Sequence, residues 1–505
     1  MTRRAVRRGS YLIFFGIFLL VLLVTHLWAL PLPYFWDEAG QYVPAALDLM
    51  HGAWISHSAP PTIHPPGVLA YLALAWAAAG FHPWVTRVAM LLVAAGALMA
   101  AFLLAIELSR EVRGVPAFLV AALVFLCPVF FAQSVLAQLD LPAMLFTTLA
   151  LLWFVQNRLL AAAAACAALV MVKETGAVVP LVFAVWLLHE KRMRESLWFF
   201  ASLAPLAAWA VAVRSATGSW IGSNAFLQYN VLDPLQPTRI LAALGRRLYY
   251  LFFANFHWMG TQAILLAWRT SRIFRSRAWR ISIWLAAAHI AIVTLLGGAV
   301  LERYLLPILP ILYTAMVAGL ALLRSKPRLV CSAILLAGVA AGNLINPFYP
   351  FPYENNLAFS DYVKLHSQAA EFLARRYPEA RIASVWPMTA EVHRPELGYV
   401  NRALRIERLP DLSAGTLQRL DWHRVDVLVV YSRHWDPSLN LLRWGPIGWL
   451  ANHFTRSAED VSATEAFSMV PLPNQAHFER RGQWVDVYAN PEAGKGAVVL
   501  VQGNR

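Results

Sequence analysis

The stretch YLIFFGIFLLVLLVTHLWAL (residues 11–30) decides the fold class of this chain. It contains no Asp, Glu, Lys or Arg over about 20 residues, which is the length that an α-helix needs to cross a bilayer. The run is too long for the core of a secretory signal peptide, so we interpret it as an uncleaved anchor. The whole chain shares this character, because 59% of its 505 residues are hydrophobic and only 14% are charged. The composition therefore predicts an α-helical polytopic membrane protein.

We expect about eleven transmembrane helices, because apolar runs of roughly spanning length recur along the first 350 residues. The candidates lie near 10–30, 84–107, 115–134, 141–156, 159–172, 176–189, 196–213, 248–268, 281–300, 304–323 and 329–347. The apolar segment 66–80 is shorter and is flanked by prolines. We interpret it as a juxtamembrane or re-entrant helix.

The loop charges predict the orientation of these spans. Lys and Arg cluster at 191–194, 269–280 and 324–328, and alternate loops contain fewer of them. By the positive-inside rule the basic loops and the N-terminus are cytoplasmic, and an odd number of spans places the C-terminal region outside. The net charge of +14 is thus explained by topology, and no nucleic-acid partner is expected. Membrane lipids are the expected surroundings.

Residues 351–505 are expected to form a small extracytoplasmic α/β domain. The prolines of 346–352 (NPFYPFP) interrupt the preceding helix, because each proline removes a donor and restricts its neighbour. Beyond them the sequence predicts a helix over 361–377 and short strands over 381–386, 425–431 and 485–488. The chain therefore divides into a transmembrane domain, 1–350, with a long outer loop, 31–83, and this second domain.

The acidic pair Asp37-Glu38 directly follows the first span. Two carboxylates beside Phe35 and Trp36 at a membrane surface could deprotonate an acceptor hydroxyl or hold a divalent cation. The pair could equally belong to a hydrated loop that starts a helix beside an interfacial aromatic belt.

Two histidines lie further along the same loop, His57 and His64, the latter before Pro65-Pro66. They could contact phosphate. Two histidines seven residues apart on a proline-rich loop have no fixed ligand geometry, so we predict no metal site from them.

Asp140 stands in the motif Gln138-Leu139-Asp140-Leu141-Pro142, between the predicted third and fourth spans. It could cap the helix that begins at Pro142, since Asp is common just before a helix and Pro is common at its first position. It could also face Asp37 as a second active-site carboxylate. The spacing permits both roles.

Basic residues on the predicted outer face run against the positive-inside trend. A lipid phosphate would explain them, because Lys and Arg form charge-assisted bonds to phosphate oxygens. The alternative is local pairing of neighbours and snorkelling at the lipid surface. We favour phosphate binding for Lys173 and Arg303, and the alternative for Arg246 and Arg247. The basic groups are Lys173-Glu174-Thr175, Arg246-Arg247 and Glu302-Arg303-Tyr304.

Taken in order, these motifs resemble the membrane glycosyltransferases of the C-type fold. The similarity is to the bacterial branch related to protein O-mannosyltransferases and lipid A aminoarabinose transferases, and it covers roughly residues 10–350. It is carried by Asp37-Glu38, the Pro65-Pro66 turn, Gln138-Leu139-Asp140-Leu141-Pro142, Lys173-Glu174-Thr175-Gly176 and Glu302-Arg303-Tyr304-Leu305-Leu306-Pro307.

The resemblance implies an inverting enzyme that moves a hexosyl or pentosyl group from a polyprenyl-phosphate donor to a lipid, polysaccharide or protein acceptor. Transfer would occur on the outer face of the bacterial cytoplasmic (inner) membrane, with loop 31–83 as the catalytic loop. No cofactor is expected to be required, and a divalent cation stays open. The implied catalytic residues are Asp37, Glu38 and Asp140. The donor phosphate would contact Lys173, Arg303, His64 and Tyr304, with Glu174, His57, Arg246 and Arg247 as further candidates.

The chain departs from the aminoarabinose transferases before the Pro-Pro turn, where they carry Lys and this sequence has His64. A neutral histidine contacts phosphate more weakly, so the donor sugar cannot be inferred from that subgroup. A non-enzymatic transporter or flippase of lipid-linked saccharides is the alternative function. Such a protein should show polar residues near the middle of several spans, whereas here the ionisable residues gather at one predicted face.

Overall fold

The computed structural model describes residues 8–110, 112, 114–435, 460–490 and 493. Arg3, Arg4 and Arg7, which contribute to the predicted cytoplasmic N-terminus, lie outside them. The described chain separates into two compact units. Among the described residues, unit 1 contains those of 8–30 and 45–345, and unit 2 contains those of 31–44 and from 346 onward. Unit 2 thus includes residues 31–44, the start of the outer loop. The boundary that we expect after residue 350 places these residues in the first domain instead.

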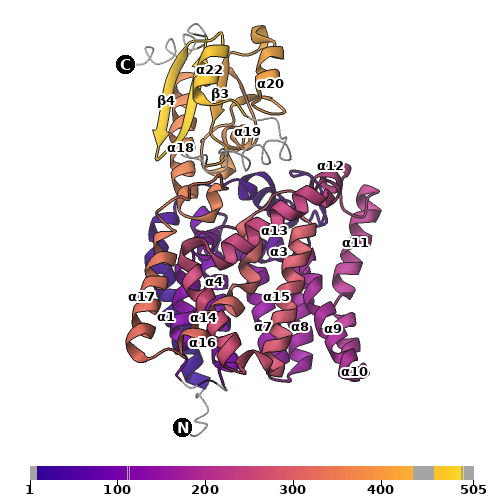
Figure 1. Cartoon of the computed structure of the whole chain (residues 1–505). Helices are drawn as coiled ribbons and strands as arrows, with labels where there is room; N and C mark the ends of the chain where they lie inside the picture. The colour runs from indigo at the N-terminus through magenta and orange to yellow at the C-terminus, as the bar shows by residue number, and fades with distance from the viewer. Residues whose placement is uncertain (1–7, 111, 113, 436–459, 491–492, 494–505) are drawn as a thin grey trace. The chain divides into compact units, whose positions relative to one another are not determined.

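Unit 1 is a helical bundle, in which the long helices run side by side (Figure 1). Its helices are α1 (Arg8–His26), α2 (Val43–Met50, entering from unit 2), α3 (Gly67–Ala79), α4 (Pro83–Leu108), α5 (Ala117–Leu126), α6 (Pro128–Gln133), α7 (Asp140–Val155), α8 (Leu159–Val172), α9 (Val178–His189), α10 (Met193–Ala201), α11 (Ala204–Thr217), α12 (Asn224–Leu227), α13 (Pro237–Phe252), α14 (His257–Thr270), α15 (Arg277–Leu295), α16 (Leu309–Leu320) and α17 (Ser325–Ala341). Helix α7 lies in the middle of the bundle and packs against α4 and α8.

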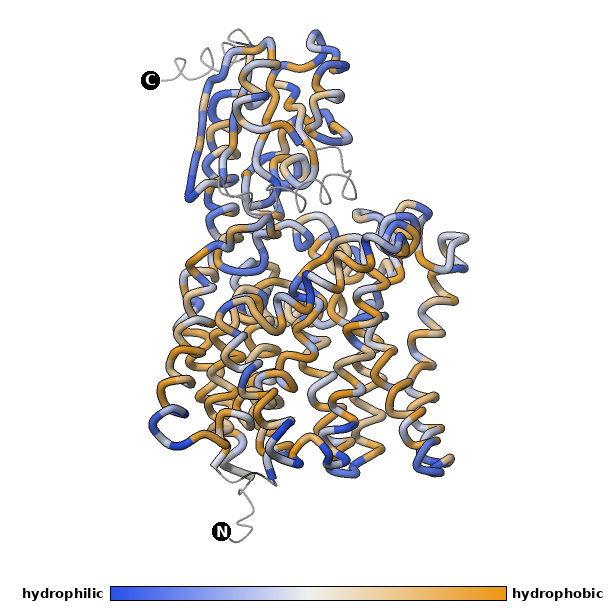
Figure 2. Tube along the Cα trace, in the orientation of Figure 1, coloured by the Kyte–Doolittle hydropathy of each residue, from blue (hydrophilic) through white to orange (hydrophobic). Residues whose placement is uncertain are grey.

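Five of the described helical segments are long and apolar enough to cross a membrane. They are Tyr11–Ala29, Pro83–Leu108, Met193–Thr217, Arg277–Leu295 and Glu302–Leu320. Other apolar helices of the bundle, α7 and α8 among them, are shorter. Apolar residues dominate the bundle along its length (Figure 2). The structure therefore supports a helical membrane protein, and the number of eleven spans stays a prediction.

Two predicted spans, 115–134 and 248–268, are not continuous helices. In the first, α5 ends at Leu126 and α6 begins at Pro128, and Cys127 between them is not helical. The second has a larger break. Helix α13 ends at Phe252, and α14 begins only at His257. Between them Asn255 and Phe256 adopt left-handed backbone conformations, with φ of 50° and 63°. Hydropathy is averaged over many residues and reports no backbone conformation, so it does not detect such a break within a largely apolar stretch.

The sheet domain of unit 2 confirms the helix and strands predicted from the sequence. Helix α18 (Ala358–Arg376) precedes β1 (Arg381–Ser384), α19 (Met388–His393), β2 (Arg405–Arg408), α20 (Ala414–Arg419), β3 (Val427–Tyr431), α22 (Ala463–Met469), β4 (Asn474–Arg480) and β5 (Gln483–Ala489). The strand order is β2-β1-β3-β5-β4, with β1 parallel to both β2 and β3 and with β5 antiparallel to both β3 and β4. All five residues of β3 are buried, as expected for the apolar central strand.

Candidate active site

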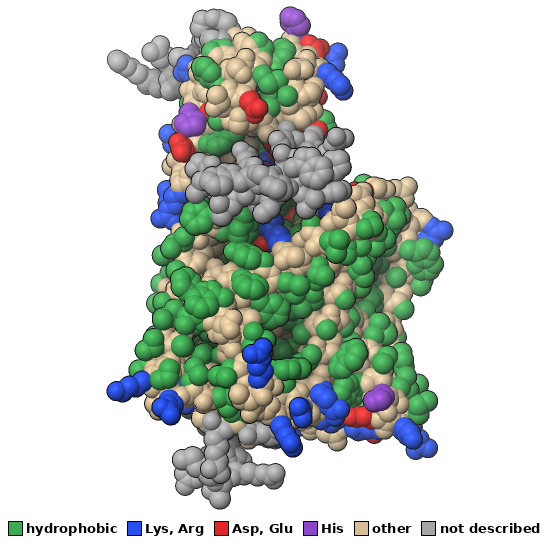
Figure 3. All heavy atoms as spheres, in the orientation of Figure 1, with side chains coloured by type: hydrophobic (Ala, Val, Ile, Leu, Met, Phe, Trp, Pro, Cys, Tyr) green, Lys and Arg blue, Asp and Glu red, His purple; other side chains and the backbone are tan. Residues whose placement is uncertain are grey.

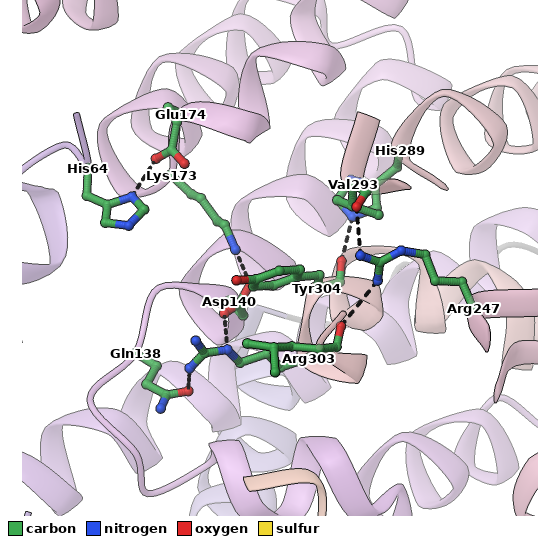
Figure 4. A network of polar contacts seen from close by, with 11 residues as sticks. His64, Gln138, Asp140, Lys173, Glu174, Arg247, His289, Val293, Arg303 and Tyr304 are labelled. Carbon is green, nitrogen blue, oxygen red and sulfur yellow. Dashed lines mark hydrogen bonds and ion pairs between the residues drawn. The ribbon is translucent and has the colours of Figure 1, made fainter. Parts of the chain in front are cut away.

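Asp140 is the centre of a group of charged side chains inside unit 1 (Figure 4). Its Oδ1 pairs with the Lys173 ammonium, and its Oδ2 lies 3.2 Å from Arg303 Nε. The Lys173 ammonium also lies 4.1 Å from the centre of the Tyr304 ring, and the Arg303 guanidinium lies 5.7 Å from it. We call Asp140, Lys173, Arg303 and Tyr304 the Asp140 cluster. The structure thus brings together one predicted carboxylate and three predicted phosphate-binding residues.

The ends of three helical elements place these side chains. Asp140 is the first residue of α7, where a negative charge is favoured by the helix dipole. Lys173 adopts an extended conformation at the end of α8, before the 3₁₀ turn η3 (Glu174–Ala177). Arg303 and Tyr304 lie on the 3₁₀ helix η8 (Glu302–Ile308), which leads into α16. Since α7 begins at Asp140 rather than at Pro142, Asp140 does not precede the helix as its cap.

The Asp140 cluster is shielded from solvent. Asp140 is 3% exposed, Arg303 4% and Lys173 8%. Burying a charge is costly unless an opposite charge is near, and two cations around one carboxylate leave a net charge of one positive. The cluster therefore favours an additional anion.

A pocket opens beside the cluster. Asp140, Lys173 and Tyr304 border it together with His289. The rest of its wall is formed by Ala143 and Thr147 of α7, Leu169 of α8, Thr175 and Gly176 of η3, Val293 of α15 and Pro307 of η8. His289 Nε2 lies 2.7 Å from the Tyr304 carbonyl oxygen, which ties α15 to η8. His289 was not anticipated from the sequence, where it is a single histidine in an apolar run.

The neighbouring charges have protein partners other than those suggested by sequence adjacency. His64 Nδ1 lies 2.9 Å from Glu174 Oε2, so the histidine before the Pro-Pro turn reaches the residue next to Lys173. Glu302 pairs with Arg246 at 2.7 Å. The Glu174 and Glu302 carboxylates, which directly follow Lys173 and precede Arg303 respectively, thus belong to further ion pairs beside the Asp140 cluster.

Arg247 holds the backbone near the cluster. Its guanidinium donates hydrogen bonds to the carbonyl oxygens of Val293 (2.6 Å) and Leu301 (3.2 Å), and it lies 5.8 Å from the Tyr304 ring. These contacts join α13 to the end of α15 and to the residue before η8.

His57 lies on an exposed turn. The Asp48 carboxylate accepts hydrogen bonds from the backbone N–H groups of His57 and Ser58 and from the hydroxyls of Ser56 and Ser58, at 2.7–2.8 Å. Partial burial raises the pKa of Asp48, but these hydrogen bonds outweigh it and hold the pKa below its ordinary value. The turn is therefore fixed by Asp48, and its His57 side chain is exposed.

Asp37 and Glu38 belong to unit 2. Glu38 is fully buried, and its Oε2 accepts a hydrogen bond from the Phe35 N–H at 2.9 Å. Asp37 is partly exposed and directly precedes the π-helical turn η2 (Glu38–Tyr42). The two adjacent carboxylates thus differ: Glu38 is buried and hydrogen-bonded within its own loop, whereas Asp37 is partly exposed.

Among the described residues there is no group of three or more His, Cys, Asp and Glu that could hold a metal ion. The expected catalytic residues and phosphate ligands come from two groups of residues: the Asp140 cluster with its neighbours in unit 1, and Asp37-Glu38 in unit 2.

No protein-family model matches the chain, and no curated relative matches it. Its fold is similar to two solved structures of ArnT, the lipid A aminoarabinose transferase, from Cupriavidus metallidurans. The structure bound to undecaprenyl phosphate has a TM-score of 0.55 at 13% identity, and the apo structure has 0.54 at 14%. Both alignments cover 95% of this chain and 98% of that chain.

A structure of the archaeal oligosaccharyltransferase AglB from Archaeoglobus fulgidus, in complex with an inhibitory peptide and a dolichol-phosphate, has a TM-score of 0.47 at 11% identity. It covers 83% of this chain and 69% of that chain. The likeness to ArnT is one of fold, and it extends over nearly the whole length of both chains. The chain has the C-type glycosyltransferase fold.

Proposed function

We propose that this protein, a membrane protein with the C-type glycosyltransferase fold, transfers a sugar from a polyprenyl-phosphate donor to an acceptor of the bacterial cell envelope. The observation that carries this proposal is the Asp140 cluster, in which two cations surround one carboxylate within an apolar bundle. A buried cation pair needs an anionic ligand or a structural reason. A lipid-linked phosphate is such a ligand.

The charges of the cluster suit the phosphate of such a donor. The phosphodiester of a polyprenyl-phosphate sugar has one negative charge, which balances the one positive charge that Asp140, Lys173 and Arg303 leave together. When the bond between the anomeric carbon and the phosphate oxygen breaks, the phosphate gains a second negative charge. Lys173 and Arg303 stabilise this developing charge, which is the main electrostatic contribution expected in such a transfer.

Asp37 is the residue that we assign as general base. It accepts the proton of the acceptor hydroxyl while the acceptor oxygen attacks the anomeric carbon from the face opposite the phosphate. The configuration is inverted, because a single displacement forms no covalent sugar–enzyme intermediate. The partial exposure of Asp37 leaves it accessible to an acceptor, whereas Glu38 is buried and bonded to its own loop.

The distribution of charge in unit 1 supports an outward-facing site. Lys and Arg side chains gather at one end of the helical bundle, at the bottom of Figure 3. Helix α7 runs from Asp140 to Val155, where Arg158 follows, and α8 returns to Lys173. The Asp140 cluster is therefore at the end away from Arg158. With Arg158 on the cytoplasmic side, as the positive-inside rule favours, the cluster faces the outer side of the cytoplasmic membrane.

The proposal is tested with full-length protein in proteoliposomes that contain a labelled polyprenyl-phosphate sugar and envelope extract as acceptor. We expect transfer by the wild type and a loss of about 100-fold or more with Asp37→Asn, since general-base catalysis contributes about 10²–10⁴-fold. Asp421→Asn is the matched control, because Asp421 is an exposed carboxylate of the sheet domain. Parallel reactions with EDTA and with added Mg²⁺ or Mn²⁺ test whether a divalent cation takes part.

A flippase would give a different result in the same vesicles. It would move the labelled donor between leaflets without forming a glycosylated product, and Asp37→Asn would not change product formation. Transfer at the wild-type rate by Asp37→Asn would contradict the role that we assign to Asp37. Transfer that does not depend on Lys173 or Arg303 would contradict the phosphate site.

A further inference from the structure

The segment before Asp37 is built into the sheet-containing unit, although more than 300 residues separate the two along the chain. The Tyr34 N–H donates a hydrogen bond to the Leu397 carbonyl oxygen at 3.2 Å. The Tyr399 hydroxyl donates one to the Tyr34 carbonyl oxygen at 3.0 Å. The backbone of the outer loop is therefore fastened on both sides of Tyr34 to the residues after α19.

Aromatic side chains of the same unit surround the next two residues. The Phe35 ring packs edge-on against Tyr362, with 5.3 Å between ring centres. The Trp36 ring lies 5.7 Å from Tyr362 and 5.1 Å from Trp386. We call Tyr362 and Trp386 the aromatic clamp. Such edge-to-face pairs restrict the rings that they join in both position and orientation.

The clamp is supported from behind by a buried polar pair. The Tyr362 ring stacks on His366 with 3.7 Å between ring centres. His366 Nδ1 in turn lies 2.6 Å from Glu391 Oε2, and both residues are at most 1% exposed. Since Tyr362 and His366 are on α18 and Glu391 is on α19, the pair fixes Tyr362 relative to two helices.

The backbone held by the clamp is in an unusual conformation. Trp36 has φ of 43°, in the left-handed region that side chains other than glycine rarely adopt. Glu38–Tyr42 then forms a π-helical turn, a form that is frequent at functional sites. Gly40 in this turn lies directly under the Trp386 indole, and a Cβ at position 40 would collide with that ring. Strained backbone of this kind persists only where its surroundings fix it.

We propose that Tyr362 and Trp386 are positioning residues that hold Phe35-Trp36 in this conformation and thereby aim the Asp37 carboxylate. The inference rests on the proposed function, which makes Asp37 the base. It assigns to the C-terminal domain a part in the chemistry that acts through Asp37, because this domain holds residues 31–44 of the catalytic loop. Ordinary core packing requires neither a left-handed tryptophan nor a glycine beneath an indole ring.

The test uses full-length protein in nanodiscs and two measurements, hydrogen exchange of residues 31–42 by mass spectrometry and steady-state transfer kinetics. Trp386→Ala is the main variant, because Trp386 is 37% exposed and its removal leaves the sheet core in place. We expect exchange of residues 31–42 to become at least tenfold faster. We also expect kcat to fall about tenfold, with the KM for the donor changed less than twofold. Trp386→Phe retains a ring and should restore most of the rate.

Gly40→Ala alters the same contact from the loop side and leaves the sequence of the sheet domain unchanged. We expect it to reduce kcat because its Cβ displaces the indole. We expect the double variant Gly40→Ala/Trp386→Ala to be no worse than Trp386→Ala, since the collision is then absent. Phe467→Ala is the matched control, because Phe467 is an exposed aromatic residue of the same unit. It should change neither measurement.

The outcomes separate this inference from the proposed function. Unchanged exchange of residues 31–42 in Trp386→Ala would overturn the positioning role, even if Asp37→Asn is inactive. Faster exchange with an unchanged kcat would also overturn the positioning role, because the position of the loop would then not control the rate of transfer. Normal transfer by Asp37→Asn would instead contradict the proposed function, in which Asp37 is the general base.

Discussion

The Asp140 cluster and the loop before Asp37 are held in place by different physical means. In the cluster, charged groups within an apolar bundle hold one another, and the arrangement follows from the cost of burying any of them alone. In the loop, aromatic rings surround a strained backbone, which the Glu38 carboxylate also fastens, and the partly exposed Asp37 lies on it. The cluster is therefore sensitive to a change in charge at constant shape. The loop should be sensitive to a change in shape at constant charge.

The comparison suggests a division of labour for the proposed reaction. A phosphate is attracted to positive charge over several ångströms, so its site can be built from electrostatic attraction. A base must meet one proton at hydrogen-bond distance, which requires a fixed direction. We expect the predictions below to separate these two requirements.

The largest effect is expected from Asp140→Asn, which keeps the shape and removes the charge at the centre of the cluster. It leaves Lys173 and Arg303 buried without their counter-ion, so we expect a loss of about 3–5 kcal/mol in stability. Thermal unfolding of the purified protein measures it. Polyprenyl phosphate should stabilise this variant more than the wild type, because the ligand replaces the missing charge. Equal stabilisation of both would show that Asp140 does not compete with the phosphate.

A smaller effect is expected from Lys173→Met, which removes one cation and keeps the length of the side chain. A hydrogen bond to a charged group contributes about 1.5–3 kcal/mol, so the KM for the donor should rise about 10–100-fold. Steady-state kinetics with varied donor measure this change. Lys326→Met, an exposed lysine of α17, is the control that should leave the KM unchanged. An unchanged KM in Lys173→Met would exclude Lys173 from the phosphate site.

Glu38→Gln tests whether the second carboxylate of the acidic pair is structural. Glutamine can still accept the Phe35 N–H, but a neutral acceptor is weaker by about 1 kcal/mol, so the rate should fall about fivefold to tenfold. Asp37→Asn should lose far more. Hydrogen exchange of the loop should become faster in Glu38→Gln, whereas Asp37→Asn should leave it near the wild type. Equal losses of rate in the two variants would contradict the division between them.

The smallest effect is expected from His477→Gln, on the edge strand β4 and away from both regions. The hydrogen bond to Asp486, at 2.7 Å, raises the pKa of His477 above its ordinary value. Its contribution to stability is therefore complete below the ordinary histidine pKa and is lost as the pH rises through the raised value. His477 is half exposed, so we expect a few tenths of a kcal/mol at most. The unfolding temperatures of wild type and variant should differ by about 1 °C at pH 5.5 and agree at pH 8.5.

The sequence was sufficient to single out Asp140, Lys173 and Arg303 because their signal is electrostatic, but it did not predict that they pair with one another. Asp140, Lys173 and Arg303 interrupt apolar segments in which a charge is costly, so each is conspicuous by itself. Their exact partners were less predictable. Adjacency suggested Lys173 with Glu174 and Glu302 with Arg303, whereas the structure pairs Glu174 with His64 and Glu302 with Arg246.

The aromatic clamp could not be predicted in the same way. Aromatic residues make up 12% of the chain, so nothing in the sequence distinguishes Tyr362 or Trp386 from the others. The helix α18 and the strands β1, β3 and β5 were predicted from local patterns, because periodicity and apolar runs are local properties. The joining of residues 31–44 to that domain depends on contacts between distant segments. The break at Asn255-Phe256 was missed for a related reason, since backbone conformation is not visible in hydropathy.

Unit 2 joins residues 31–44 to residues from 346 onward, and this has a consequence for the biosynthesis of the protein. Residues 31–44 leave the ribosome early, but the residues that surround them follow only after roughly 300 more have been synthesised. At about 5–20 residues per second, this interval lasts about 15–60 s. During that time Tyr34 and Phe35, which are buried in the finished protein, lack their final neighbours. The loop that carries Asp37 and Glu38 therefore adopts its final conformation late in biosynthesis. A chain that ends before the sheet domain can insert its helices but lacks the residues that position Asp37.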